Sequence, residues 1–502
     1  MADAATAFAG RTLILLSNRE PYEHVSRRGE IEVRYPPGGL VSALDPTLRR
    51  TDGVWVAWGS GSADRVTADA CGRLPVPPPP DDPAYTLRRV WLDDADVEGY
   101  YLGFANSVLW PLCHLLVQHY QFRADQWERY RSVNARFGDA VLEEARRVGG
   151  QPIVWIQDYH FALVADQVRA SAPDLFIHQF WHIPFPPPEI LHLLPYGAYE
   201  AILHGLVGND LLGFHTERYA QNFLNCVADL LPGASVDRDA RTVCYEGRTM
   251  SVGAFPISID VDRYEQLSEA RDVAAHAQEL RRQYSTGDRQ LGVSVDRIDY
   301  TKGIVERLRA LDLLWQESPE LRGRFTMLFV ATPSRSELAP YCALQAEIVS
   351  QVEAINRRFA TPGWIPVVLV TKNADATELA ATYRAADLCL VSSLQDGMNL
   401  VAKEFIACQA DEQGVLVLSR FTGAAEEIDG AVLVNPFNVD GYAAGIRRAL
   451  EMPLEERQRR MREMRERLRH ATIFDWLQSI ADRVHALIAA GPDCVTPTPS
   501  TT

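Results

Sequence analysis

Two basic side chains follow an apolar run in the stretch SVDRIDYTKG, residues 294–303. Arg297 and Lys302 come after the strand-like segment LGVSV, and a glycine follows them. In an α/β sheet, a strand, a charged loop, a glycine and a helix build an anion site at the carboxyl end of the strand. The pattern therefore predicts that Arg297 and Lys302 bind an anion.

A second loop of the same kind, SSLQDGMNLVAKEF, carries two carboxylates. We expect Asp396 at the start of a helix and Glu404 two turns further along the same face. The amides of Gly397, Met398 and Asn399 would then point out of the helix toward a ligand's oxygens. Because a carboxylate can accept both hydroxyls of a ribose, the two loops together describe a nucleotide-sugar site. The alternative is that Asp396 only caps the helix and that Glu404 is a surface charge.

Further candidate residues follow strand-like segments elsewhere in the chain. They are Arg19 in SNREPYEH, Gly38 and Gly39 in PPGGLVSAL, Tyr101 and Trp110 in YYLGFANSVLWP, Asp158 in IQDYH, His182 in FWHIPFP and Arg335 in ATPSR. Two glycines that open a helix let the backbone approach a phosphate closely. His182 fits a site residue and also a packed histidine at a strand end.

Strand-like and helix-like segments alternate along the chain, which is typical of α/β architecture. The expected strands are 12–18, 54–60, 152–158, 175–183, 290–296, 325–331, 365–371, 387–393, 414–419 and 430–436. Helices are expected at 160–173 and at 304–316, where apolar residues recur at helical spacing. A chain of 502 residues exceeds one compact core, so the sequence predicts two Rossmann-like domains with the site in the cleft between them.

The bulk composition limits the function classes. Net charge is −16, which disfavours nucleic acid and anionic membranes as partners. The eight cysteines are scattered, no apolar run is long enough to span a membrane, and the N-terminus lacks a basic signal-peptide region, so a cytoplasmic protein is expected. The run GSGSAD lacks the third glycine of a dinucleotide fingerprint, and the acidic run at 93–96 is expected to be a solvated loop. No metal and no cofactor is predicted.

A series of short motifs occurs in one order along residues 12–488. The motifs are SNR, GGL, YY…F.N.VLWP, W..DYH, HIPFP, LLGFHTE, DR.DY.KG, PSR, DGMNLVAKE, GVLVLS.F.GAA and VNP. In this order they resemble the trehalose-6-phosphate synthase family, retaining glycosyltransferases of the two-Rossmann-domain (GT-B) type. The series is specific, whereas any one member is weak.

The resemblance implies roles for the candidate residues. Arg297 and Lys302 would hold the donor diphosphate, and Asp396 with the segment Gly397, Met398, Asn399, Leu400, Val401 and Glu404 would hold the glucose hydroxyls and the ribose. Gly38 and Gly39 would close over the donor, and His182 would touch the sugar. The acceptor, glucose 6-phosphate, would be held by Arg19, Tyr101 and Arg335 at its phosphate and by Trp110 and Asp158 around its ring.

The resemblance also assigns the domains. Residues 1–258 would bind the acceptor and 259–470 the nucleotide sugar; 471–490 would form a helix crossing back to the first domain, before a disordered tail, 491–502. The implied reaction joins the glucose of a nucleoside-diphosphate glucose to glucose 6-phosphate, giving α,α-trehalose 6-phosphate without a protein nucleophile. The donor base stays open between UDP, GDP and ADP, because VTKNADATE carries Ala374 where the family often has an aromatic residue. A homo-oligomer is also left open.

Two alternatives remain at this point. The segment SNREPYEHV and the insert before PPGGL are closer to glucosylglycerol-phosphate synthases, so such a synthase, or a pseudo-glycosyltransferase with another phosphorylated acceptor, is the alternative enzyme. A catalytically silent sensor of sugar phosphates on the same fold is the alternative from another class. Loss of Arg297, Lys302 or Glu404 would indicate such a sensor, and all three are present.

Overall fold

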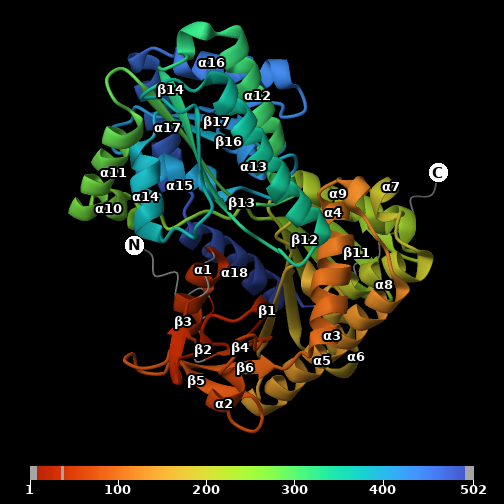
Figure 1. Cartoon of the computed structure of the whole chain (residues 1–502). Coiled ribbons are helices and arrows are strands. Elements are labelled where there is room, and N and C mark those ends of the chain that lie inside the picture. Colours follow the sequence, from red (N-terminus) through yellow and green to blue (C-terminus); the bar gives the residue numbers. More distant parts are fainter. Residues whose placement is uncertain (1–7, 9, 36–38, 52, 492–502) are drawn as a thin grey trace, which may run out of the picture. The chain divides into compact units, whose positions relative to one another are not determined.

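The computed structural model describes residues 8, 10–35, 39–51 and 53–491 (Figure 1). They form two compact units. Unit 1 comprises the described residues of 1–256 and 474–502, and unit 2 comprises 257–473. The candidate Gly38 and residues 492–502 of the predicted tail lie outside the described residues.

Unit 1 contains a sheet of ten strands among the described residues, in the order β10-β11-β12-β9-β8-β7-β1-β4-β6-β5. The strands from β12 to β6 pair in parallel, and antiparallel pairs occur only toward the two edges of this sheet. The bounds are β1 (Leu13–Arg19), β4 (Val54–Trp58), β5 (Arg73–Val76), β6 (Tyr85–Val90), β7 (Ile153–Gln157), β8 (Phe176–Phe180), β9 (Leu211–Phe214), β10 (Ser235–Asp237), β11 (Thr242–Tyr245) and β12 (Arg248–Ala254). A separate hairpin joins β2 (Glu23–Arg27) and β3 (Glu30–Arg34).

Strand β1 is the point at which the strand order of this sheet reverses. It is paired with β4 on one side and β7 on the other, so the chain builds the sheet outward from β1 in both directions. Residues Leu13 to Leu16 are fully buried, as a central parallel strand requires. Ligands of open α/β sheets bind outside the carboxyl ends of strands at such a point, and β1 ends at the exposed Arg19.

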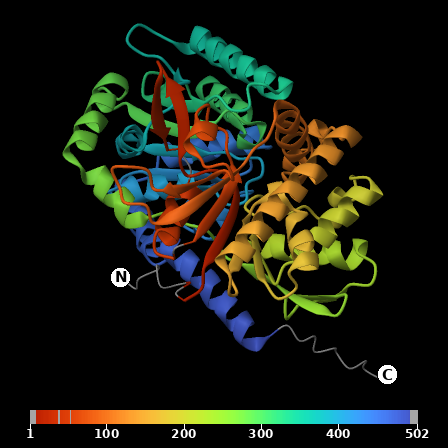
Figure 2. The same ribbon diagram turned by 90° about the horizontal axis from the view of Figure 1, so that it is seen from below.

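Helices surround the sheet of unit 1. They are α1 (Gly39–Leu48), α2 (Asp64–Thr67), α3 (Asp94–Asp96), α4 (Trp110–Cys113), α5 (Ala124–Val148), α6 (Val164–Ser171), α7 (Pro188–Leu191), α8 (Tyr196–Val207), α9 (Glu217–Leu230), α18 (Ile473–Ala490) and the π-helical segment Val97–Leu109. From Phe474 onward the last helix, α18, is part of unit 1 (Figures 1 and 2). Its Trp476 ring packs 6.0 Å from the Trp155 ring and 5.2 Å from the Phe180 ring, so strands β7 and β8 bury its apolar face.

Unit 2 contains a six-stranded, fully parallel sheet in the order β15-β14-β13-β16-β17-β18. The bounds are β13 (Gln290–Arg297), β14 (Phe325–Thr332), β15 (Val367–Val370), β16 (Leu388–Val391), β17 (Val415–Ser419) and β18 (Val432–Val434). Strand β13 lies between β14 and β16, so here too the order reverses at the first strand. This strand ends at Arg297.

The helices of unit 2 contact one another in two groups (Figure 1). One group is α12 (Ile304–Glu317), α13 (Ala339–Phe359) and α16 (Val439–Leu450); the other is α10 (Val261–Glu269), α11 (Arg271–Tyr284), α14 (Ala376–Ala385), α15 (Leu400–Cys408) and α17 (Leu454–Arg469). The predicted face of α12 is confirmed, because Leu308, Leu311 and Trp315 are buried in a core with β14 side chains such as Phe325.

Some local predictions differ from the structure. The helix expected at 160–173 begins at Val164, after a short 3-10 turn at 159–161. Asp158, just before this turn, has a positive φ of 70°. The strand expected at 175–183 ends at Phe180. The sequence patterns did not predict the π-helical segment Val97–Leu109.

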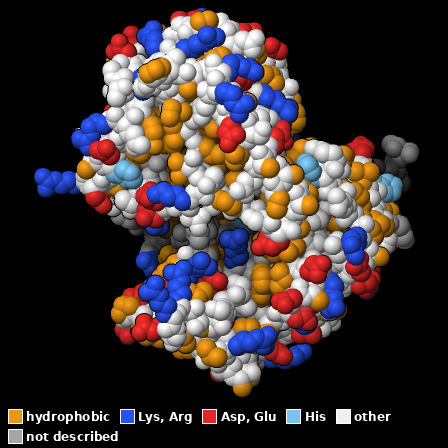
Figure 3. Space-filling model, in the orientation of Figure 1, with side chains coloured by type: hydrophobic (Ala, Val, Ile, Leu, Met, Phe, Trp, Pro, Cys, Tyr) orange, Lys and Arg blue, Asp and Glu red, His pale blue; other side chains and the backbone are white. Residues whose placement is uncertain are grey.

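Basic and acidic side chains both occur on each part of the face in Figure 3. Within the described ranges, no helix is both long and apolar enough to cross a membrane. The same part of the chain contains no group of three or more His, Cys, Asp and Glu side chains arranged to hold a metal ion.

Candidate active site

The first candidate loop follows β13 in unit 2. Arg297 ends the strand with its side chain exposed, and Lys302 closes a short 3-10 turn that begins at Tyr300. Gly303 comes next with a left-handed φ of 60°, and a Cβ atom there would collide with the carbonyl oxygen of Ser392. A glycine is therefore required for the turn to deliver Lys302 and then start α12.

The loops after β13 and β16 form one assembly. Lys302 Nζ lies 2.7 Å from Asp396 Oδ2, and the Leu394 amide donates to the Thr301 carbonyl at 2.7 Å. Ser392 Oγ donates to the Gly303 carbonyl at 2.9 Å. The structure thus brings together the basic loop and the carboxylate loop, as the sequence predicts for one site.

The predicted helix start at Asp396 is wrong. Helix α15 begins at Leu400, and Asn399 is its N-cap, accepting the Ala402 amide through Oδ1 at 3.0 Å. Asn399 has an unusual φ of 127° and also donates through Nδ2 to Asp396 Oδ2 at 3.1 Å. The alternative that Asp396 is a simple cap is wrong for the same reason, because Asp396 instead accepts from Lys302, Ser393 and Asn399.

The later start of α15 adds candidate amide donors to those expected from the sequence. The Asp396 amide donates to the Phe421 carbonyl, and the Met398 carbonyl accepts from Ala424, so the segment around Gly397 is attached to the loop after β17. The helix itself opens with Leu400 and Val401. First-turn amides have no acceptor within their own helix, so those of Leu400 and Val401 are further candidate donors to a ligand's oxygens beside the predicted amides of Gly397, Met398 and Asn399.

Glu404 is half-buried and held by two tyrosines. Its Oε1 accepts from Tyr264 at 3.0 Å and its Oε2 from Tyr383 at 2.9 Å. Burial raises the pKa of Glu404 above its ordinary value, although the hydroxyls of Tyr383 and Tyr264 act to lower it. The alternative of a plain surface charge is wrong, because both carboxylate oxygens have fixed orientations and each keeps a lone pair for a further donor.

A buried arginine that the sequence did not single out supports the assembly. Arg307 is fully buried in α12, with Nη1 2.7 Å from Asp296 and Nε 2.9 Å from Ser392 Oγ. Ser392 in turn contacts the Lys302 and Gly303 carbonyls. Helical spacing could have revealed a charge on the core face of α12, but its partners follow only from the strand order.

Arg335 follows β14 and points back toward the β13 loop. Its side chain is only 7% exposed, and its Nη1 lies 3.0 Å from Asp299 Oδ2 and 2.6 Å from the Tyr341 hydroxyl. Its backbone has a left-handed φ of 48°. Sequence-distant residues held in such conformations cluster at functional sites, and Asp158, Arg335 and Asn399 are all candidate residues of this kind.

The unit 1 candidates are connected through aromatic rings. Arg19 pairs in register with Trp58 of β4, and the Trp58 ring lies 5.8 Å from Tyr101. Tyr101 stacks on His160 with ring centroids 5.9 Å apart. Trp110, 7% exposed, packs 5.9 Å from the ring of Tyr159 in the adjoining turn. Gly39, the second predicted glycine, opens α1.

His182 and Asp158 lie together at the ends of β7 and β8. The His182 amide donates to Asp158 Oδ1 at 3.1 Å, and the His182 ring contacts Gln157 Oε1 through Nε2 at 2.8 Å. Burial, together with the neighbouring His215 and His178, holds the pKa of His182 well below its ordinary range. The ring is therefore neutral at physiological pH and suited to hydrogen bonding with a sugar hydroxyl.

An ionic cluster anchors the β1–β2 loop, which follows Arg19 in the chain. The sequence did not predict this cluster. The fully buried Arg89 bonds Glu20 at 2.7 Å and Asp64 at 2.8 Å, and it also contacts the His24 ring. Glu20 Oε1 accepts from the Ser60 amide. The cluster joins three segments, so it fixes the backbone on which Arg19 sits.

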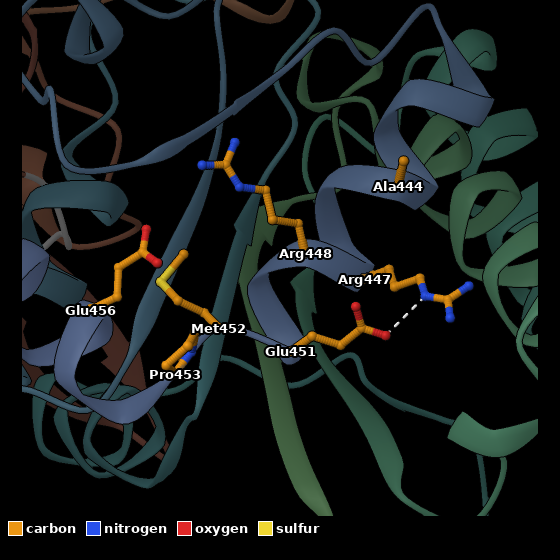
Figure 4. Close-up of a pocket in the computed structure, with 7 residues that line it drawn as sticks. All are labelled: Ala444, Arg447, Arg448, Glu451, Met452, Pro453 and Glu456. Atoms are coloured by element: carbon orange, nitrogen blue, oxygen red, sulfur yellow. Dashed lines mark hydrogen bonds and ion pairs between the residues drawn. The ribbon is translucent and has the colours of Figure 1, made fainter.

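A hollow of about 370 Å³ lies between α16 and α17 and contains no candidate residue (Figure 4). Arg447 and Arg448 point away from each other there, and Arg447 Nε is bonded to Glu451 at 2.9 Å. The two guanidinium groups of this hollow therefore do not converge on one ligand.

Comparison with known proteins places the chain among described enzymes. The Glycosyltransferase family 20 pattern matches residues 11–486. This chain belongs to glycosyltransferase family 20. It is 39% identical over 487 residues to a trehalose-6-phosphate synthase of Mycobacterium marinum, covering 95% of this chain and 94% of the relative.

Two solved structures show the same fold. An α,α-trehalose-phosphate synthase (UDP-forming) of Burkholderia xenovorans in complex with glucose 6-phosphate is 32% identical, with a TM-score of 0.82 and coverage of 94% of this chain and 100% of that chain. An E. coli protein bound with UDP-2-fluoro glucose is 31% identical, with a TM-score of 0.82 and coverage of 94% and 98%.

These comparisons confirm the predicted membership of the trehalose-6-phosphate synthase family, the fold class with two Rossmann-like domains and the prediction of an enzyme. They favour a trehalose-6-phosphate synthase over a glucosylglycerol-phosphate synthase and over a silent sensor.

Proposed function

We propose that this chain transfers glucose from a nucleoside-diphosphate glucose to glucose 6-phosphate with retention of configuration, forming α,α-trehalose 6-phosphate. The observation that carries the proposal is the joined pair of loops after β13 and β16, which presents Arg297, Lys302 and Asp396 at the point where the strand order reverses. Family membership over residues 11–486 supports the same reaction.

In this proposal unit 2 binds the donor. Breaking the donor bond leaves negative charge on the diphosphate, which the exposed guanidinium of Arg297 and the ammonium of Lys302 stabilise. Lys302 has three N–H groups, so it can donate to a phosphate while it stays bonded to Asp396. Asp396 accepts hydrogen bonds from the glucose hydroxyls, and Glu404 accepts them from the ribose hydroxyls. The opening amides of α15 donate hydrogen bonds to oxygens of the donor.

Unit 1 binds the acceptor sugar. Arg19 and Tyr101 meet the phosphate, Trp110 and Asp158 surround the ring, and the neutral His182 contacts the transferred glucose. Arg335 of unit 2 is a further phosphate ligand. The acceptor proton passes to the leaving diphosphate on the same face, so no side chain acts as a nucleophile.

The donor base in the proposal is uracil, because one solved relative is named UDP-forming and another binds UDP-2-fluoro glucose. The reaction takes place in the cytoplasm.

Release of nucleotide tests this function. Purified protein is mixed with UDP-, GDP- or ADP-glucose and with glucose 6-phosphate, glycerol 3-phosphate or glucose. We expect fastest release with UDP-glucose and glucose 6-phosphate. Faster turnover with glycerol 3-phosphate or with a cyclitol phosphate would replace the proposal with the alternative synthase.

A further inference from the structure

Asp299 is a residue of unit 2 to which the proposed reaction assigns no role. It lies in the same loop as Arg297 and Lys302 and is fully buried. A fully buried carboxylate is costly unless its oxygens are well paired. The hydrogen-bond partners of Asp299 therefore indicate the role of this buried carboxylate.

Each oxygen of Asp299 has a different kind of partner. Oδ1 accepts from the amide and from the hydroxyl of Thr301, both at 3.0 Å, which fixes the turn that delivers Lys302. Oδ2 accepts from Arg335 Nη1 at 3.0 Å and from the Tyr341 hydroxyl at 3.4 Å. One carboxylate thus connects the loop after β13 to the arginine after β14.

The charge balance at Asp299 favours the same conclusion. Burial raises the pKa of this carboxyl, but Arg335, Arg297 and Lys302 outweigh burial and hold the pKa below its ordinary value. Asp299 is therefore ionised at neutral pH. Its negative charge offsets the repulsion among cations that must stay close together before any anionic substrate arrives.

We propose that Asp299 is a positioning residue that holds Arg335 in register with the Lys302 turn, so that the acceptor phosphate and the donor diphosphate are recognised by one rigid group. This inference rests on the proposed function. Arg335 contacts Asp299 through Nη1, and its remaining N–H groups have their directions set by that contact because the guanidinium is planar. The Tyr341 hydroxyl, 2.6 Å from Nη1, steadies the same edge.

The variants Asp299→Asn and Arg335→Ala test the proposal, with kcat/KM measured for glucose 6-phosphate and for glucose. A charge-assisted hydrogen bond contributes roughly 10- to 100-fold to such a preference. We expect Asp299→Asn to lower the preference for the phosphorylated acceptor about tenfold or more, mainly through its KM. The double variant should show no further loss of preference beyond Arg335→Ala, because the two residues act as one unit.

Asp387→Asn is the matched control. Asp387 also pairs with an arginine, Arg281 at 2.7 Å, and accepts a backbone amide, from Leu291, but it lies at the amino ends of β13 and β16. It should leave the acceptor preference unchanged. If Asp299→Asn slows both acceptors equally, as a purely structural role would, the proposal is overturned.

Tyr341→Phe decides the case in which Asp299→Asn does not fold. It keeps the buried ring and removes one hydroxyl, so we expect a roughly threefold lower preference. An unchanged preference in a folded Tyr341→Phe protein would then reject the proposal.

If the wild-type protein turns over neither acceptor, the proposed function itself fails. Calorimetric binding of glucose 6-phosphate then becomes the readout for Asp299. Weaker binding to Asp299→Asn than to the Asp387→Asn control supports the positioning role, and equal binding contradicts it.

Discussion

Unit 1 and unit 2 each contain a strand at which the sheet order reverses, and each of these strands ends in an exposed arginine. The other candidate side chains of the two units differ in their partners. In unit 2 the candidate side chains are paired with acids, as in Lys302–Asp396 and Arg335–Asp299. In unit 1 they are held mainly by aromatic stacking and neutral hydrogen bonds, as in Tyr101–His160 and His182–Gln157.

This difference corresponds to two kinds of ligand group. Cations paired with buried acids are preorganised for the charge that develops on a leaving diphosphate. Aromatic faces and neutral donors suit a sugar ring, whose hydroxyls carry no charge. Variants of unit 2 should therefore change rates strongly and in a salt-dependent way, whereas variants of unit 1 should change acceptor affinity modestly.

The largest effect is expected at Lys302. Lys302→Ala removes one preorganised charge from the leaving group, which costs about 3–4 kcal/mol of barrier, or on the order of several hundredfold in kcat. Arg297→Ala should behave alike. Steady-state kinetics measure both, with Arg459→Ala as the control, because Arg459 forms an exposed pair with Glu463 in the same unit. Near-normal rates in both variants would contradict a role for these two cations in the reaction.

Glu404→Gln should weaken donor binding about tenfold while acceptor binding changes little. A neutral amide accepts ribose hydroxyls less strongly than a carboxylate does, and it also disturbs the contacts with Tyr264 and Tyr383. Separate titrations of the two substrates measure this. Glu347→Gln, at an exposed pair with Arg309, is the control. An equal loss for both substrates would contradict a role at the nucleotide.

Tyr383→Phe should shift the pH dependence of donor binding. An ionised Glu404 binds the donor, so affinity is lost as the pH falls through the Glu404 pKa. The Tyr383 hydroxyl lowers that pKa against the raising effect of burial. Its removal raises the pKa, and the loss of donor affinity should begin at a higher pH than in the wild type. Donor KM measured across pH tests this, and a shift to lower pH would refute it.

The smallest effect is expected in unit 1. Tyr101→Phe keeps the ring stacked on His160 and removes one hydroxyl, which should raise the acceptor KM about two- to tenfold. Donor KM and the salt dependence should stay as in the wild type. A fall in kcat as large as that of Lys302→Ala would end the distinction between the two units.

Much of this arrangement could be predicted from the sequence, because it depends on local patterns. Apolar runs followed by charged loops were enough to predict that Arg19 and Arg297 end strands, and the glycine after Lys302 indicated a tight turn. Helix α12 was predictable from apolar spacing alone.

The pairings could not be predicted in this way. Lys302 and Asp396 are 94 residues apart and meet only because β13 and β16 are neighbours. Tyr264, Tyr383 and Glu404 come from three helices. Helix α15 starts later than predicted because Asn399, in a rare backbone conformation, is its cap in place of Asp396.

The most direct test of the account is the structure of the product, followed by proton NMR during a reaction of UDP-glucose with glucose 6-phosphate. The account predicts a single non-reducing sugar phosphate whose two anomeric protons both show α configuration, formed at the rate of UDP release. A product with a free reducing end, or with a β linkage, would contradict it.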